Sequence, residues 1–209
     1  MLDLTQGQFV KHVVMHPFEG FEDLRWKKAG SVKIAIGIVC LLFIQALAYN
    51  RMYGFQYYSS YDKIFNIVPF IFQSFGIFLL YVVCNWAMCT LFDGEGSMKN
   101  IFIVTAYSLI PYICGRLIGT LLSHILIRDE YIFIQAFEIV GTAWTVVLFI
   151  SAMKAVHQFS FGKTLALILL TLGAMILVLF LLVLLLTLFQ QVLIFIFTIY
   201  TELSYRLRV

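Results

Sequence analysis

Residues 85–116 read NWAMCTLFDGEGSMKNIFIVTAYSLIPYICGR, and this stretch decides the fold. It holds the end of one apolar segment, a short polar turn at residues 93–100, and the start of a second apolar segment. The second segment carries a proline, Pro111, and five residues later an arginine, Arg116. Proline bends a helix and arginine is costly in lipid. The stretch therefore predicts a membrane hairpin whose second arm is bent and contains a charge.

The composition extends this prediction to the whole chain. The chain has 209 residues, of which 62% are hydrophobic and 12% are charged. A soluble domain has about 25% charged residues, so an ordinary water-facing surface is excluded. The length leaves room for several spans with short connections and for no second soluble domain.

Five segments are apolar enough to cross a bilayer. A span needs about 20 mostly apolar residues. The segments that meet this condition cover residues 31–48, 64–92, 101–127, 131–153 and 165–188. The predicted fold class is therefore all-α: a polytopic integral membrane helical bundle (residues 31–188) with five transmembrane helices.

The last apolar run, residues 165–200, is longer than one span requires. At about 1.5 Å per residue it would measure about 54 Å, against a hydrocarbon core of about 30 Å. We expect a break at Gln190-Gln191 and a separate amphipathic helix at the interface over residues 189–209. Six spans is the alternative interpretation.

The first thirty residues differ from the predicted spans because they mix apolar residues with charged ones. Apolar residues recur at helical spacing between Phe9 and Val14, and after His16-Pro17 aromatic residues alternate with charged ones. This pattern predicts an amphipathic segment at the membrane surface. A docking surface for a cytoplasmic partner is the alternative.

Lysine and arginine predict the orientation, because cytoplasmic loops are enriched in both. If the N-terminus is cytoplasmic, the inner segments hold eight of these residues and the outer segments hold five. The inner residues are Lys11, Arg25, Lys27, Lys28, Lys33, Lys99, Lys154 and Lys163, and the outer ones are Arg51, Lys63, Arg128, Arg206 and Arg208. The N-terminus is therefore predicted inside and the C-terminal helix outside.

Arg116 and Glu138 are the two charges predicted to lie deep in the membrane. Arg116 comes about twelve residues before the turn at residues 128–130, and Glu138 comes about eight residues after it. In an antiparallel hairpin the two reach a similar depth. An isolated charge there costs at least about 2.5–3.5 kcal/mol, which pairing relieves. We therefore predict an Arg116–Glu138 contact, which either fixes helix packing or lines a polar cavity or an ion path.

The other polar residues in the spans form no pattern typical of a catalytic, metal or cofactor site. Gln73, Asn85, His124 and Gln135 are candidates for a polar network inside the bundle. The four histidines lack metal-ligand spacing and the four cysteines form no CxxC pair, so the thiols are expected to be buried as small apolar side chains. No catalytic residue, metal site or cofactor is predicted, and the chain is not expected to be an enzyme.

The opening hairpin resembles the bacterial branch of the Yip family, polytopic membrane proteins named for eukaryotic members that interact with Rab-type GTPases. The run from Ala106 to Pro111, Ala-Tyr-Ser-Leu-Ile-Pro, is similar to the family's Gly-Tyr-x-Leu-x-Pro signature. The residues that carry the resemblance are Trp86, Gly94, Gly96, Tyr107 and Pro111. The Asp-Leu-Tyr-Gly-Pro motif of eukaryotic members is not found, so a Rab-binding role does not carry over.

The resemblance implies a non-enzymatic scaffold or accessory subunit in a bacterial cell membrane. Such a protein would bind other membrane proteins, for example a transport system, and its partners would be membrane lipids and either a membrane protein or a second copy of the chain. No nucleic-acid partner is expected. The alternative function is a small transporter or channel component with a polar path at Arg116 and Glu138.

Overall fold

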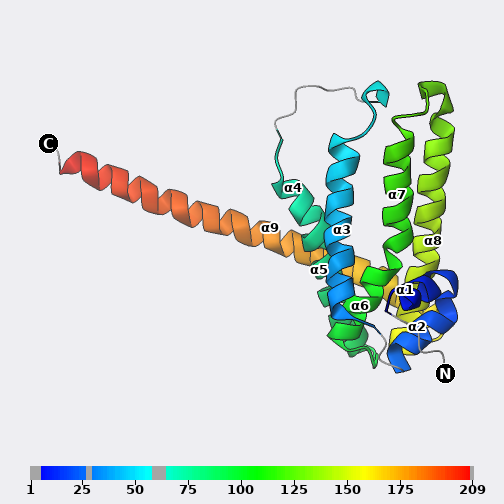
Figure 1. Ribbon diagram of the computed structural model, residues 1–209. Helices are drawn as coiled ribbons and strands as arrows, with labels where there is room; N and C mark the ends of the chain where they lie inside the picture. Colours follow the sequence, from blue (N-terminus) through cyan, green and yellow to red (C-terminus); the bar gives the residue numbers. More distant parts are fainter. Residues whose placement is uncertain (1–5, 27–29, 58–64, 208–209) are drawn as a thin grey trace.

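The computed structural model describes residues 6–26, 30–57 and 65–207, which form helices and their connections (Figure 1). Within these ranges there is no β-strand. Five helical segments are long and apolar enough to cross a membrane: Val32–Arg51, Val68–Leu91, Met98–Leu122, Arg128–His157 and Phe161–Arg206. The prediction of an all-α membrane bundle with five spans is confirmed.

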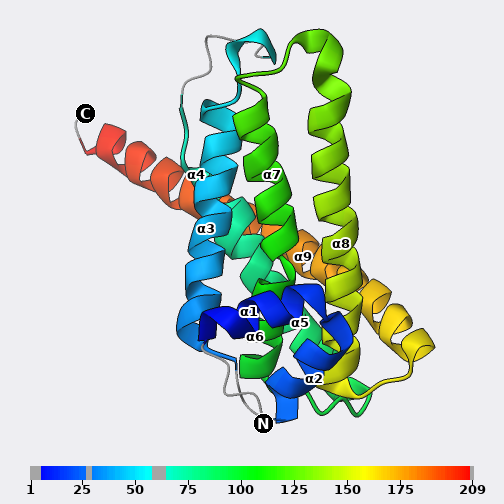
Figure 2. The ribbon, with the colours of Figure 1, turned by 45° about the vertical axis from the view of Figure 1, so that its right-hand side comes forward.

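Two short helices, α1 (Gln6–Met15) and α2 (Pro17–Trp26), lie against one end of the bundle, which we call the N-terminal side (Figure 2). Their buried side chains include Phe9, Val13, Phe21 and Leu24. These belong to the main hydrophobic core, so the predicted amphipathic segment packs its apolar face on the bundle itself. Residues 1–5 and 27–29 of that segment lie outside the described residues.

The first span is α3 (Val32–Arg51), and the chain returns through α4 (Val68–Ile71), η2 (Phe72–Gly76) and α5 (Ile77–Leu91). The segment η2 is one turn of π-helix in the middle of the second span. A π-turn inserts extra backbone into an α-helix and is frequent at functional sites. Here it contains Gln73 and Ser74, and Ser74 is buried.

The third span is the arm predicted to be bent. It consists of α6 (Met98–Ser108) and α7 (Ile110–Leu122), with Ser97 accepting a hydrogen bond from the Asn100 N–H at the start of α6. The helix is interrupted at Leu109, just before Pro111. Pro111 has no N–H to donate to the preceding turn, so the α-helical ladder cannot pass through this point.

The fourth span, α8 (Tyr131–His157), follows the short helix η3 (Arg128–Glu130) and returns beside α7 (Figures 1 and 2). It ends at Gln158, whose left-handed backbone (φ 55°) turns the chain toward the last helix. The Gly115–Gly141 crossing brings α7 and α8 close: a Cβ added at Gly141 would lie 2.7 Å from the Pro111 carbonyl oxygen.

The last helix corrects one prediction. Helix α9 (Phe161–Arg206) runs for 46 residues without interruption, so the expected break at Gln190-Gln191 and the separate interfacial helix over 189–209 do not occur among the described residues. Glutamine is a good helix former, and residues 174–206 contain neither Gly nor Pro. Polarity alone therefore does not end the helix.

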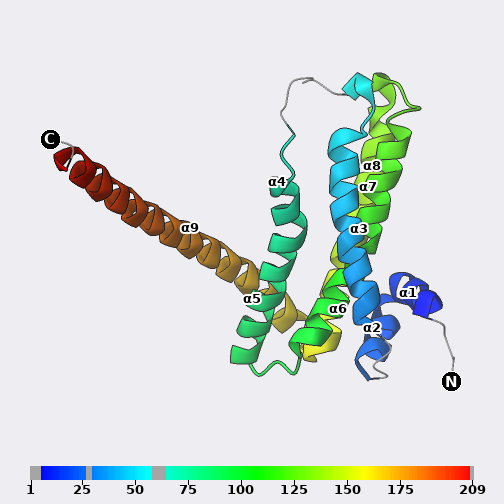
Figure 3. The same cartoon turned by 60° about the vertical axis from the view of Figure 1, so that its left-hand side comes forward.

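Helix α9 also leaves the bundle. Only Thr164, Leu167, Thr171 and Met175 of α9 are buried, and every residue from 180 to 203 is exposed. Figures 1 and 3 show the C-terminal part of the helix projecting obliquely away from the other spans. At about 1.5 Å per residue, α9 is about 69 Å long, more than twice the thickness of a hydrocarbon core of about 30 Å.

The cysteines only partly follow the prediction. All four are free, and Cys84 and Cys89 are buried. Cys40 and Cys114 are exposed on the bundle surface, where burial was expected. An apolar thiol is compatible with lipid contact as well as with a protein interior.

Candidate functional site

The structure brings Arg116 and Glu138 together across the α7–α8 contact. Arg116 Nη1 lies 3.9 Å from Glu138 Oε2, and the two side chains are 25% and 16% exposed. This separation is an ion pair without a short hydrogen bond, which would require about 2.7–3.2 Å. Arg116 Nε and Glu138 Oε1 are buried without a hydrogen-bond partner among the described residues. The two charges compensate each other, and each retains unused hydrogen-bonding capacity.

Aromatic rings supply the rest of the environment of Arg116. Its guanidinium carbon lies 3.5 Å from the ring centroid of Tyr49 and 5.6 Å from that of Tyr112. A guanidinium over an aromatic face is stabilised by the ring quadrupole, more strongly where water is excluded. Arg116 is therefore held from α3 and from its own helix as well as from α8.

The bend in the third span contributes a second link between α7 and α8. The Tyr112 N–H lies just beyond the interruption at Leu109 and donates to Thr145 Oγ1 of α8 at 2.9 Å. Ser108 Oγ, on the other side of the bend, donates to the Thr105 carbonyl at 2.8 Å. The Tyr112 N–H and the Ser108 hydroxyl, which flank the bend, are thus satisfied by a neighbouring side chain and a carbonyl, as buried polar groups in membrane helices require.

A second polar cluster on the N-terminal side is centred on Arg25 of α2. Its Nη1 donates to the carbonyls of Ala155 (3.0 Å) and Val156 (2.6 Å), and its Nη2 pairs with Glu95 of the hairpin turn. The sequence analysis did not predict this cluster. Arg25 and Glu95 are separated by 70 positions, and neither shows a local pattern that would point to the other.

A third cluster corrects the predicted polar network. Asn85 Oδ1 lies 3.1 Å from His157 Nε2, and Asn85 Nδ2 lies 3.4 Å from Thr171 Oγ1. Asn85 thus joins α5 to α8 and α9 rather than joining Gln73, Gln135 and His124. His124, which follows the end of α7, contacts the Thr120 carbonyl of α7 through Nδ1 at 2.9 Å, and Gln135 is exposed.

The two glycines of the hairpin motif lie at close contacts with the end of α8. A Cβ added at Gly96 would lie 2.5 Å from His157 Cε1, and one added at Gly94 would lie 2.8 Å from His157 Nδ1. Both glycines therefore let the turn pack on the end of α8. Tyr107 is 1% exposed, whereas Trp86 is exposed on α5. The motif mainly secures the contact of the hairpin with α8.

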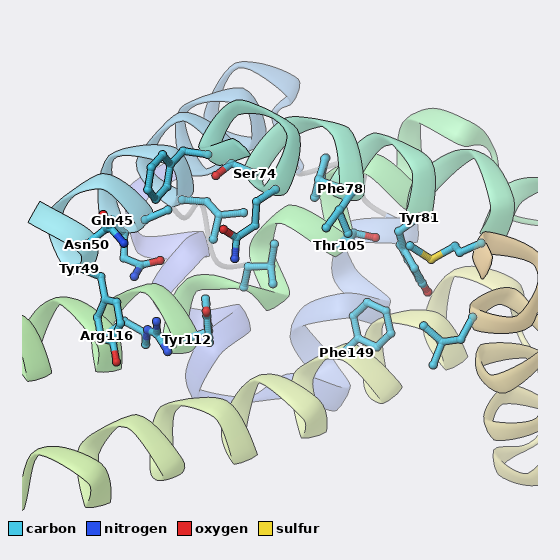
Figure 4. A pocket seen from close by; sticks show the side chains of 18 residues that line it. Gln45, Tyr49, Asn50, Ser74, Phe78, Tyr81, Thr105, Tyr112, Arg116 and Phe149 are labelled. Carbon is cyan, nitrogen blue, oxygen red and sulfur yellow. The ribbon is translucent and has the colours of Figure 1, made fainter. Parts of the chain in front are cut away.

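A cavity of about 590 Å³ lies between the spans, with Arg116 on its wall (Figure 4). Each of the five spans contributes at least one residue to the wall. Among the described residues, no group of three or more His, Cys, Asp or Glu side chains is placed to bind a metal ion. The cavity is therefore lined by neutral polar and apolar side chains with a single arginine.

Fold and site together define a polytopic α-helical membrane protein whose spans are joined by buried polar contacts. A family model described as the Yip1 domain matches residues 11–185. The chain therefore belongs to the Yip1 domain family, and the family prediction is confirmed. No curated protein and no solved structure matches the chain. The matched range ends inside α9, so residues 186–206 of that helix lie beyond it.

Proposed function

We propose that this chain is a non-enzymatic scaffold or accessory subunit that binds another membrane protein, such as a transport system, through α9. The observation that carries the proposal is the pair Gln190-Gln191. Both amides lie in the exposed part of α9, and neither has a hydrogen-bond partner among the described residues. An amide in lipid without a partner is costly, and such side chains join membrane helices by hydrogen bonds.

The shape of α9 supports the same function. Its first part is anchored to the bundle by Thr171 and Met175, which are buried, while residues 180–203 are exposed. The free part also carries Thr187 and Thr198, small polar residues of the kind enriched where membrane helices meet. A transmembrane helix of another protein would cover this surface and pair with the glutamines.

The charge distribution supports an orientation for the complex. In the sequence, the segments assigned to the N-terminal side of the spans hold eight Lys and Arg residues, and the segments assigned to the other side hold five. We therefore place the N-terminus in the cytoplasm and the end of α9 outside, in a bacterial cell membrane.

Photocrosslinking tests the proposal. A benzophenone amino acid is incorporated at Phe189, beside the glutamines, or at Val140, an exposed residue of α8. We expect an adduct of discrete protein mass from position 189 and lipid adducts from position 140. The double change Gln190→Leu/Gln191→Leu should abolish the protein adduct. The control Ile176→Val, at an exposed residue of α9 outside residues 180–203, should retain it. The proposal is wrong if both positions give the same adducts or if the leucine variant still forms the protein adduct.

The alternative, a small transporter or channel component with a path at Arg116 and Glu138, is favoured by one observation: the cavity reaches Arg116. Cysteine labelling separates the two functions. In a chain without native cysteines, Arg116→Cys should react with a membrane-impermeant maleimide if water enters a transport path. If Arg116→Cys does not react with the maleimide and position 189 gives a protein adduct, the scaffold function is supported.

A further inference from the structure

The cavity between the spans has a size and a wall suited to a ligand. Its volume of about 590 Å³ falls within the range of about 300–1,000 Å³ typical of small-molecule sites. The cavity lies within the membrane-spanning segments, so a ligand would reach it from the lipid phase or from one membrane surface.

The two ends of the cavity differ in chemistry. Figure 4 shows Tyr49, Asn50, Tyr112 and Arg116 gathered at one end, with Gln45 beside them. Toward the other end lie Phe78, Tyr81 and Phe149. Leu172 and Met175 of α9 add apolar surface to the wall. An occupant complementary to both ends has a polar head and an apolar tail.

Several polar groups of the wall have no partner. Ser74 Oγ, Tyr81 Oη and Thr105 Oγ1 are buried and make no hydrogen bond within the described chain. Gln45 is 2% exposed. Orphaned polar groups are uncommon in folded proteins. Ser74 lies toward the Arg116 end of the cavity, where the polar head of an occupant would supply a partner, whereas Tyr81 lies beside Phe78 at the other end (Figure 4). Ser74 belongs to the π-turn η2, a feature that is frequent where helices form binding sites.

Arg116 determines the charge of the head. A guanidinium only donates hydrogen bonds, and Glu138 at 3.9 Å leaves those donors unsaturated. Carboxylate and phosphate oxygens match the fork of donors on arginine. A cationic head would instead be repelled by the charge of the arginine.

We infer that the cavity binds an amphiphile whose phosphate or carboxylate head contacts Arg116 and whose hydrocarbon tail lies between Phe78, Phe149 and Met175. A membrane phospholipid and a free fatty acid share this chemistry. The inference does not depend on the scaffold function, since it concerns the bundle and not the free part of α9.

Photolabelling of the full chain in phosphatidylcholine nanodiscs tests the inference. The probes are phosphatidylglycerol, phosphatidylcholine and a fatty acid, each with a diazirine at the end of a tail. Phosphatidylglycerol or the fatty acid should label peptides that contain Phe149 or Met175 more strongly than the peptide around Val140, which lies on the bundle surface. The more efficient of the two identifies the source of the head. Equal labelling of cavity and surface peptides, as a water-filled cavity would give, overturns the inference.

Two variants test the tail and the head separately. Ala46→Trp fills the cavity from α3 and should reduce labelling at Phe149 and Met175 about tenfold, while the control Val140→Trp should not. The double change Arg116→Gln/Glu138→Gln removes the charge without leaving one carboxylate unpaired. It should weaken phosphatidylglycerol labelling about tenfold, the loss expected for one charge-assisted hydrogen bond. If labelling survives in either variant, the assignment of that end is wrong.

Discussion

Arg116 shows how a single charge is accommodated inside the spans. Glu138 neutralises it at 3.9 Å, and the ring of Tyr49 covers its guanidinium at 3.5 Å. Neither contact is a short hydrogen bond, so no partner saturates the side chain. A charge held in this way is stable in the membrane and can still bind a further group.

If Arg116 and Glu138 interact, substitutions of the two residues should be coupled in their effect on the free energy of unfolding. Arg116→Ala and Glu138→Ala should each lower the free energy of unfolding by about 1–3 kcal/mol, because each leaves the other charge without its partner. The double variant should lose less than the sum, with a coupling of about 0.5–2 kcal/mol. Unfolding in mixed micelles of dodecyl sulfate measures all three. If the loss in the free energy of unfolding of the double variant equals the sum of the two single losses, Arg116 and Glu138 do not interact.

Gly96 predicts a steric effect at the hairpin turn. In Gly96→Ala the new Cβ would lie 2.5 Å from His157 Cε1 and 2.7 Å from Val156 Cγ1, so the turn must move away from α8. We expect a loss of about 1–3 kcal/mol in the free energy of unfolding. The matched control is Gly173→Ala in α9, where nothing lies within 4 Å of the new atom. This control should be neutral or more stable, and equal losses in both variants would contradict the packing argument.

At the scale of the elements, α9 is the helix whose structure differs most from the structure that its amino-acid pattern predicts. A continuous helix places Leu184 and Glu202, eighteen residues apart, at about 27 Å along the axis. Spin labels at these two positions, in a chain whose cysteines are replaced, should give a single distance distribution near this value in nanodiscs. A much shorter or bimodal distribution would show that the helix breaks at Gln190-Gln191 after all.

The contact of α2 with the bundle depends on Arg25. Its guanidinium joins the carbonyls of Ala155 and Val156 at the end of α8 to Glu95 in the hairpin turn. Arg25→Ala should release α1 and α2, which hydrogen exchange would detect as faster exchange of residues 6–26.

Arg25→Lys is the informative control for that experiment. It keeps the charge facing Glu95 and loses the forked donors, so exchange should be intermediate. Exchange of α7 should remain unchanged in both variants. Protection of residues 6–26 in Arg25→Ala would mean that Phe9, Val13 and Phe21 hold the two helices without the arginine.

At the scale of the whole molecule, the sequence predicted the features that depend on local pattern. Hydropathy located the five spans, and the short turn at residues 128–130 made the equal depth of Arg116 and Glu138 calculable. The pairings of Arg25 with Glu95 and of Asn85 with His157 span 70 and 72 positions, and only tertiary packing selects them. The uninterrupted helix at Gln190-Gln191 has another cause, because helix propensity and not side-chain polarity decides whether α9 continues there.

Polar contacts fasten the bundle at both of its ends. The Arg25 cluster and the Asn85–His157–Thr171 cluster fasten α2, α5, α8 and α9 to one another on the N-terminal side. The cavity extends the other way, to Tyr49 and Asn50 near the far end of α3. At that far end the Tyr57 hydroxyl donates to the Leu126 and Ile127 carbonyls, and Arg128 donates to the Gln56 carbonyl, so the residues that follow α3 are tied to the turn between α7 and α8. A lipid whose head contacts Arg116 would therefore belong to the leaflet at that end of the bundle, and the two leaflets would not have equal access to the protein.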